Sequence, residues 1–157
     1  MANRHSYEVT VEWTGADGEG TASYRSYRRD HVVSHGSRPP IAGSSDPAFR
    51  GSPHRWNPEQ LLVASLAQCH MLWYLHLSAD AGIVVDAYVD RPVGELELDS
   101  DGSGRFVGVV LRPHVTVRAE AMVAAAAALH SQAHEMCFIA RSVAFPVTHE
   151  PTTAASS

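Results

Sequence analysis

Residues 57–82 read NPEQLLVASLAQCHMLWYLHLSADAG, and this stretch decides the fold. Asn57 is a good N-cap residue, Pro58 suits the first helical position, and Gln60 can complete a capping-box arrangement with Asn57. Gly82 suits the position just past a helix end, where a left-handed backbone is common. The pattern therefore predicts a helix that begins at Asn57 and runs to about Ala81.

Apolar residues surround this predicted helix on nearly every side, as the run LLVASLAQCHMLWYLHL at residues 61–77 shows. Such a helix is a central element covered by other parts of the protein. A chain of this size is too small to cover it completely, which predicts help from a second subunit. The run is shorter than a membrane span and carries Gln68, His70 and His76, so we expect no membrane insertion.

The chain before this helix predicts a β-hairpin followed by a long loop. Residues 6–13 alternate between apolar and polar side chains, which is typical of a half-buried strand. The turn residues GADGEG at 15–20 lead to a second predicted strand over Thr21–Val33. From Ser34 to Trp56 four prolines and three glycines interrupt any regular pattern. A loop of this length is usually functional or wraps a partner.

The chain after the helix predicts more antiparallel strands and a second helical region. The fold class is therefore α+β, with helices segregated from antiparallel hairpins. The length fits one domain, which we place at residues 1–150, ahead of a frayed tail at 151–157. The remaining predicted elements are β-rich runs over Ile83–Leu98 and Arg105–Val117, an alanine-rich helix over 119–133, a short helix over 136–142, and a last strand at Val143, Phe145 and Val147.

Composition excludes several classes of function. The chain has 157 residues, 45% of them hydrophobic, and all 12 basic residues are arginine. Without lysine there is no Schiff-base lysine, no pyridoxal-phosphate anchor and no Walker A loop. A formal charge of −5 without any basic block argues against nucleic-acid binding. The N-terminal residues MANRHSYEVT lack the apolar core of a signal peptide, so we expect a cytoplasmic protein.

Cys69 and Cys137 are the two cysteines of the chain. In a reducing compartment such a pair is either reactive or metal-binding, or else two inert buried thiols. Cys69 lies among apolar neighbours on the predicted helix, so a reactive thiolate there needs a nearby cation, which must be arginine because lysine is absent. His70 projects about 100° away from Cys69 and is a poor candidate for activating it.

Two further groups of residues have alternative interpretations. His130, His134 and Cys137 have a spacing at which three zinc-type ligands could converge, or they decorate an exposed helix face. Glu59 lies ten residues before Cys69, about 15 Å of helix rise away, so the two do not touch along one straight helix. By itself Glu59 is a carboxylate stabilised by the helix dipole.

The run NPEQLL at 57–62, followed by Cys69 in SLAQC, resembles the signature of the OsmC/Ohr superfamily of osmotically inducible and organic-hydroperoxide-resistance proteins. The resemblance covers most of the chain, and Cys137 follows Cys69 by 68 residues, about where the family places its second cysteine. It implies an OsmC-like fold in an intertwined homodimer with active sites at the subunit interface. It also implies a cysteine-based peroxidase in which Cys69 is peroxidatic, Cys137 is resolving, and Glu59 holds a catalytic arginine.

The same resemblance implies an organic hydroperoxide as substrate, a dithiol such as a lipoyl group as reductant, and no cofactor. The chain departs from the family in the turn at residues 15–20, which contains no arginine, and in Phe138, where the family usually has proline after the second cysteine. We therefore favour Arg29 and Arg25, on one face of the second predicted strand, as the catalytic arginines. The further candidates are Arg38, Arg50 and Arg55.

Two alternative functions remain at this point. One is an OsmC-like dimer that has lost the peroxidase activity and binds a small apolar ligand. The other is a metal-binding module that uses His130, His134 and Cys137.

Overall fold

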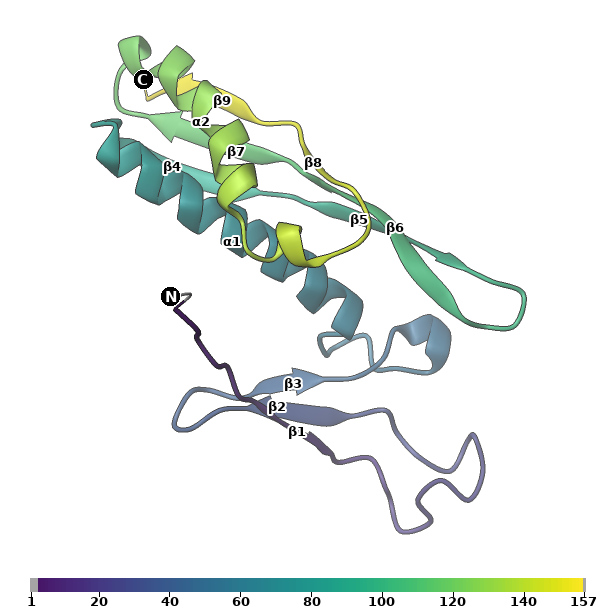
Figure 1. Ribbon diagram of the computed structural model, residues 1–157. Coiled ribbons are helices and arrows are strands. Elements are labelled where there is room, and N and C mark those ends of the chain that lie inside the picture. Colours follow the sequence, from purple (N-terminus) through teal and green to yellow (C-terminus); the bar gives the residue numbers. More distant parts are fainter. Residues whose placement is uncertain (1–2, 157) are drawn as a thin grey trace. The chain divides into compact units, whose positions relative to one another are not determined.

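The computed structural model describes residues 3–156, which form two α-helices and nine β-strands in three three-stranded sheets (Figure 1). This agrees with the predicted α+β class. By its internal contacts the chain divides into two compact units, one ending at Leu61 and one beginning at Leu62.

The first unit contains an antiparallel sheet with the order β1-β2-β3. Val33 is central to its register, because it pairs with Val11 on one side and with Ile41 on the other. The bounds of the strands are Thr10–Trp13 for β1, His31–Ser34 for β2 and Ile41–Gly43 for β3. A single turn of 3-10 helix follows at Pro47–Phe49.

Two predictions for this unit were wrong. Residues 21–30 do not continue the second strand but form turns, in which the Ser26 hydroxyl donates to the Gly20 carbonyl at 2.8 Å. The supposedly irregular segment 34–56 contains β3, because Ile41–Gly43 finds its partner in β2. Gly43 also forms a β-bridge with Trp56, which ties the two ends of this segment together.

Helix α1 spans Pro58–Asp80, and both of its predicted ends are confirmed. The Gln60 amide N–H donates to Asn57 Oδ1 at 2.8 Å, and the Asn57 N–H donates to Gln60 Oε1 at 3.2 Å. At the other end Gly82 has φ +68°, and the Ile83 N–H donates to the Ser78 carbonyl at 2.8 Å. These are a reciprocal capping box and a Schellman motif, which satisfy backbone groups that the helix leaves unpaired.

The second unit holds two mixed sheets, with the orders β4-β7-β9 and β5-β6-β8. Each predicted β-rich run forms two strands. The first run is interrupted at Arg91–Pro92 and the second run at Arg112, and in each run one strand joins the β4-β7-β9 sheet while the other joins the β5-β6-β8 sheet. The strands are β4 (Val85–Asp90), β5 (Val93–Leu98), β6 (Gly104–Leu111), β7 (Pro113–Val117), β8 (Val147–His149) and β9 (Thr152–Ala155).

The end of the chain differs from its prediction. Thr152–Ala155, expected in a frayed tail, forms β9 and pairs in parallel with β7. The predicted last strand begins later than expected, because Val143 and Phe145 precede β8, which pairs in parallel with β6. Parallel pairing with a strand that is distant in sequence supplies these hydrogen bonds, and no local sequence pattern predicts it.

Helix α2 spans Val123–Met136, after a short 3-10 turn at Glu120–Met122. The predicted helix over 136–142 is wrong at its start, because Cys137 is extended with φ −68° and ψ 111°; only Ala140–Ser142 forms a 3-10 turn.

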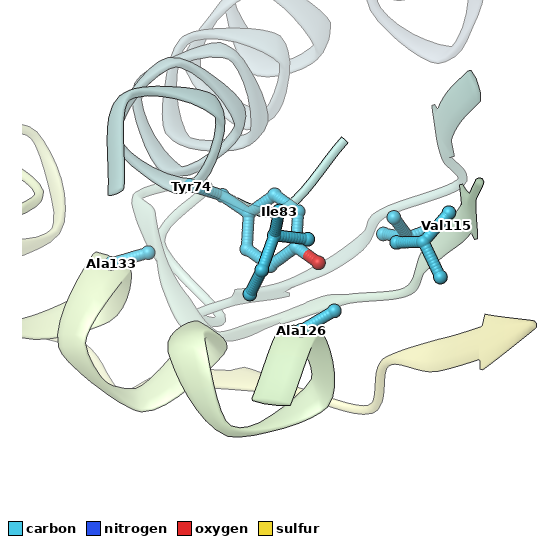
Figure 2. Close-up of a cluster of buried hydrophobic side chains, with 6 residues drawn as sticks. Tyr74, Ile83, Val115, Ala126 and Ala133 are labelled. Carbon is cyan, nitrogen blue, oxygen red and sulfur yellow. The ribbon is translucent and has the colours of Figure 1, made fainter. Parts of the chain in front are cut away.

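Two hydrophobic clusters form the core of the second unit. In the first, the Tyr74 ring extends from α1 into a group that includes Ile83, Val115 of β7, and Ala126 and Ala133 of α2 (Figure 2). The second cluster joins α1 to the other sheet through Leu66, Val109, Leu111 and Val147.

Helix α1 is not covered on every side within one chain. Its fully buried positions are Leu66, His70, Tyr74 and Ser78, which recur every fourth residue and so form one face. Leu72, on another side, is 61% exposed.

Candidate active site

Cys69 lies on α1 at the wall of an apolar pocket of about 460 Å³. The cysteine is reduced and half-buried. Consistent with helix periodicity, the pocket takes residues from the Cys69 side of α1, and none from the buried His70 face. The lining residues are Ser65, Gln68, Cys69, Leu72, Trp73, His76, Phe138 and Ile139.

Cys137 follows the end of α2 and is 1% exposed. Its thiol lies close enough to that of Cys69 for the two to interact. The Ala140 N–H donates to the Cys137 sulfur at 3.4 Å, and the Cys137 N–H donates to the His134 carbonyl at 3.2 Å. Burial raises the pKa of Cys137 to about 11, with the Ala140 hydrogen bond opposing this rise and the neighbouring Cys69 adding to it within that value. The fold therefore brings together two reduced cysteines, one open to a pocket and one protonated in the core.

Trp73 organises the aromatic wall of the pocket. Its ring meets the Phe138 ring edge to face, with centroids 5.5 Å apart, and meets the His76 ring in the same way at 5.6 Å. His76 Nε2 lies 3.4 Å from a carboxylate oxygen of Asp80, one turn further along α1. Leucine, isoleucine and aromatic side chains thus surround the sulfur, with the polar His76 beyond them.

The opposite face of α1 carries a buried imidazole pair. His70 and His130 of α2 are 0% and 1% exposed, and His70 Nε2 lies 3.0 Å from His130 Nδ1. The His130 ring also stacks on Tyr74, with centroids 4.1 Å apart. Burial, together with nearby imidazoles that include His149, lowers the pKa of His70 to about 3 and that of His130 to about 4. Both rings are therefore neutral at physiological pH.

Glu59 occupies the first turn of α1, in the unit that ends at Leu61. Its Oε2 atom is buried and has no hydrogen-bond partner within residues 3–61, and it makes no ion pair with an arginine of that segment. The proposed role of Glu59 as the holder of an arginine stays a prediction.

The favoured arginines also lie in the first unit, whereas Cys69 and its pocket lie in the second. Arg25 is exposed. The Arg29 guanidinium lies 4.0 Å from the centre of the Tyr27 ring and 4.4 Å from that of Tyr24, and it donates to the carbonyls of both tyrosines. These two arginines do not share a strand face, because residues 21–30 are not a strand. Their catalytic role also stays a prediction.

Two other arginines of the first unit are engaged with carboxylates, whereas the Arg50 guanidinium lies 6.0 Å from the centre of the Tyr24 ring. Arg28 pairs with Asp17 at 2.8 Å and with Asp30, and Arg55 lies 3.5 Å from Asp30. None of the residues that line the Cys69 pocket is an arginine.

The alternative metal site at His130, His134 and Cys137 is not formed. Within residues 3–156 no group of three His, Cys, Asp or Glu side chains is placed to hold a metal ion. His130 turns instead toward His70, and Cys137 toward Cys69. The reason is the extended backbone at Cys137, which removes it from the helical face that the spacing assumed.

Sequence reasoning found both cysteines but missed Phe138 as a pocket residue and the His70–His130 pair. In the sequence, Phe138 is distinguished as a departure from a family pattern and by its position directly after Cys137, an expected reactive cysteine, which is a signal for a pocket residue. The histidine pair gave no signal, because 60 residues separate its members.

The fold and the site together define a class: an α+β protein with two neighbouring reduced cysteines, one of which lines an apolar pocket. A family profile described as OsmC-like protein matches residues 51–152. The chain belongs to this OsmC-like family. A comparison with curated proteins finds no significant match.

Solved structures support this assignment. An OsmC-like protein of unknown function from Vibrio cholerae O1 biovar eltor is 30% identical, with a TM-score of 0.84, over 95% of this chain and 100% of that one. An organic hydroperoxide resistance protein from Legionella pneumophila is 19% identical, with a TM-score of 0.65, over 96% of this chain and 99% of that one.

A third structure, an organic hydroperoxide resistance protein from Elizabethkingia anophelis with thiocyanate bound, is 14% identical. Its TM-score is 0.65, over 98% of this chain and 100% of that one. At these identities the two resistance proteins show the shared fold alone. Separately, no helix within residues 3–156 combines the length and the apolarity that crossing a membrane demands.

Proposed function

We propose that this protein is a thiol-dependent peroxidase that reduces organic hydroperoxides to alcohols in defence against oxidative stress. One observation carries the proposal. Cys69 and Cys137 are 68 residues apart in sequence but lie close together in the fold, and Cys69 lines an apolar pocket. Membership of the OsmC-like family adds support, because relatives that share the fold are organic hydroperoxide resistance proteins.

The proposed chemistry assigns a separate step to each sulfur. The Cys69 thiolate attacks the distal peroxide oxygen, so that an S–O bond forms, the O–O bond breaks, and the alcohol leaves with a proton. The Cys137 sulfur then attacks the sulfur of the Cys69 sulfenic acid, and the hydroxyl group leaves as water with the Cys137 proton. An external dithiol, such as a lipoyl group, reduces the resulting disulfide by exchange.

The pocket walls favour a hydroperoxide with an apolar substituent. Trp73, Phe138 and Ile139 offer the substituent an apolar surface, from which hydrogen peroxide gains nothing. Two pocket residues are themselves widely exposed, Leu72 at 61% and Phe138 at 64%. Such exposure supports our proposal that a second copy of the chain closes the pocket in a homodimer. In that dimer we propose that Glu59 holds an arginine, Arg29 or Arg25, from either chain, and that the arginine stabilises the Cys69 thiolate.

The test is the consumption of cumene hydroperoxide with a dithiol reductant. Cys69→Ser should abolish turnover, and Cys137→Ser should leave a sulfenic acid or mixed disulfide on Cys69 after one turnover, detected by mass spectrometry. Full turnover by Cys69→Ser would refute the mechanism.

A second candidate function is the binding of a small apolar ligand by a dimer without peroxidase activity. The pocket supports it in one respect, because none of the lining residues that the second unit supplies, within residues 62–156, is an arginine. Titration of the Cys69 thiol separates the candidates. A pKa near or above that of free cysteine supports the binding protein, and a lower one supports the peroxidase.

A further inference from the structure

The buried His70–His130 pair joins the same two segments that carry the cysteines. His70 follows Cys69 directly on α1, and His130 lies on α2 seven residues before Cys137. The two segments therefore meet at two places, through the imidazole rings in the core and through the two sulfurs, of which that of Cys69 lies at the pocket and that of Cys137 is buried behind it.

The two contacts use different faces of α1. Adjacent helical residues project about 100° apart, so His70 points into the core while Cys69 faces the pocket. A hydrogen bond from His70 therefore fixes the backbone beside Cys69 without covering its sulfur.

Disulfide formation places a strict demand on these segments. The Cβ atoms of a disulfide lie about 3.5–4.5 Å apart, a window of roughly 1 Å. If a helix shifts along its axis by one residue, its side chains move by about 1.5 Å along that axis, which is more than this window of roughly 1 Å allows. Apolar side chains such as Ala126 and Ala133 pack tightly but without direction, whereas a hydrogen bond between two ring nitrogens fixes both distance and angle.

We propose that the His70–His130 hydrogen bond is a positioning device, which holds the end of α2 in register with α1 so that Cys137 stays within bonding reach of Cys69. His70 and His130 are positioning residues, because they act through the backbone and touch neither sulfur. The inference rests on the proposed function only in taking the Cys69–Cys137 disulfide to be part of turnover.

The test measures disulfide formation without any peroxide. Oxidised glutathione accepts two electrons and two protons from the two thiols, which gives the Cys69–Cys137 disulfide and two molecules of reduced glutathione. Equilibration in glutathione redox buffers yields the effective concentration of one thiol relative to the other. This quantity is independent of peroxidase activity.

The variants distinguish positioning from simple packing. His70→Leu and the double variant His70→Leu/His130→Leu remove the hydrogen bond, and the double variant also leaves neither member of the pair without its partner. His70→Gln and His130→Asn keep an amide at the bonding atom. Ser78→Ala, on the same buried face of α1, is the matched control.

We expect both leucine variants to lower the effective concentration about three- to tenfold, the value of one hydrogen bond. The amide variants and Ser78→Ala should stay within about twofold of wild type. A double leucine variant that matches wild type would overturn the proposal, because packing alone would then set the register. If His70→Leu does not fold, the double leucine variant and the amide variants still test whether the hydrogen bond sets the register.

A parallel measurement separates this inference from the peroxidase proposal. Dimedone labelling is done in the Cys137→Ser background, where no disulfide can consume the Cys69 sulfenic acid, after one equivalent of cumene hydroperoxide. In that background all the histidine substitutions should label as Cys137→Ser alone does. If Cys137→Ser itself is not labelled, the peroxidase proposal fails, and the glutathione measurement still decides the role of the histidine pair.

Discussion

Nε2 of His70 lies 3.0 Å from Nδ1 of His130, although 60 residues separate the two in the chain. One ring must donate and the other accept, so the accepting imidazole has to be neutral. Burial provides this condition by lowering the pKa of His70 to about 3 and that of His130 to about 4. The pair therefore couples the stability of the second unit to pH.

Stability should fall with acidification below pH 6.5. In the unfolded chain both imidazoles regain a pKa near 6.5, so between that pH and about 4 the unfolded state binds more protons than the folded state. Their stabilisation is fully present above pH 6.5 and is lost as the pH falls toward the folded pKa values. We expect a loss on the order of 2 kcal/mol per pH unit, measured by urea unfolding from pH 7.5 to 4.5. His70→Leu/His130→Leu should flatten this slope, and an unchanged slope would contradict the assignment.

Disulfide closure should accelerate with pH well above neutrality. Burial raises the pKa of Cys137 to about 11, so only a small and growing fraction of its thiol is ionised between pH 7 and 10. The closure rate onto oxidised Cys69 should rise about tenfold per pH unit over this range. Stopped-flow tryptophan fluorescence can follow the reaction, because Trp73 lines the same pocket. A plateau below pH 9 would show that Cys137 ionises normally, and Cys137→Ser should lack the phase altogether.

The aromatic wall should select the substrate. Phe138→Ala removes the ring that meets Trp73 edge to face at 5.5 Å. We expect the KM for cumene hydroperoxide to rise about tenfold, while the KM for hydrogen peroxide stays nearly constant. Leu98→Ala, at the exposed last residue of strand β5, is the control. Equal effects on both peroxides would mean that the wall does not contact the substituent.

The arginine prediction can be tested on the first chemical step. Arg25→Ala or Arg29→Ala should slow oxidation of Cys69 by cumene hydroperoxide about tenfold or more, because a thiolate in an apolar pocket needs a cation. Labelling of the Cys69 sulfenic acid with dimedone in a rapid-quench series, in the Cys137→Ser background, measures this rate. Arg105→Ala, an exposed substitution on β6, serves as the control. Unchanged rates in both variants would mean that neither arginine acts on Cys69.

Local signals in the sequence predicted α1 closely. The capping box of Asn57 and Gln60 and the left-handed Gly82 each depend on residues within one or two turns, so a short stretch contains all the information. The same holds for the position of Cys69 on the helix and for His70 facing away from it.

Predictions that depended on distant partners were less accurate. Thr21–Asp30 has strand-like residues but forms turns, because Arg28 pairs with Asp17 and Asp30 and its N–H donates to the Gly15 carbonyl. Thr152–Ala155 has no strand pattern, yet it pairs with β7.

The sequence by itself determined the central helix, its two ends, its cysteine and the family to which the chain is similar. Only the tertiary structure decided that Cys137 leaves its helix to meet Cys69, that Phe138 walls the pocket, and that His70 bonds His130. The physical reason is the separation along the chain between the residues that interact. Caps and helix faces arise from neighbours a few residues apart, whereas a sulfur pair, a pocket wall and a buried hydrogen bond need segments that meet only when the chain is folded.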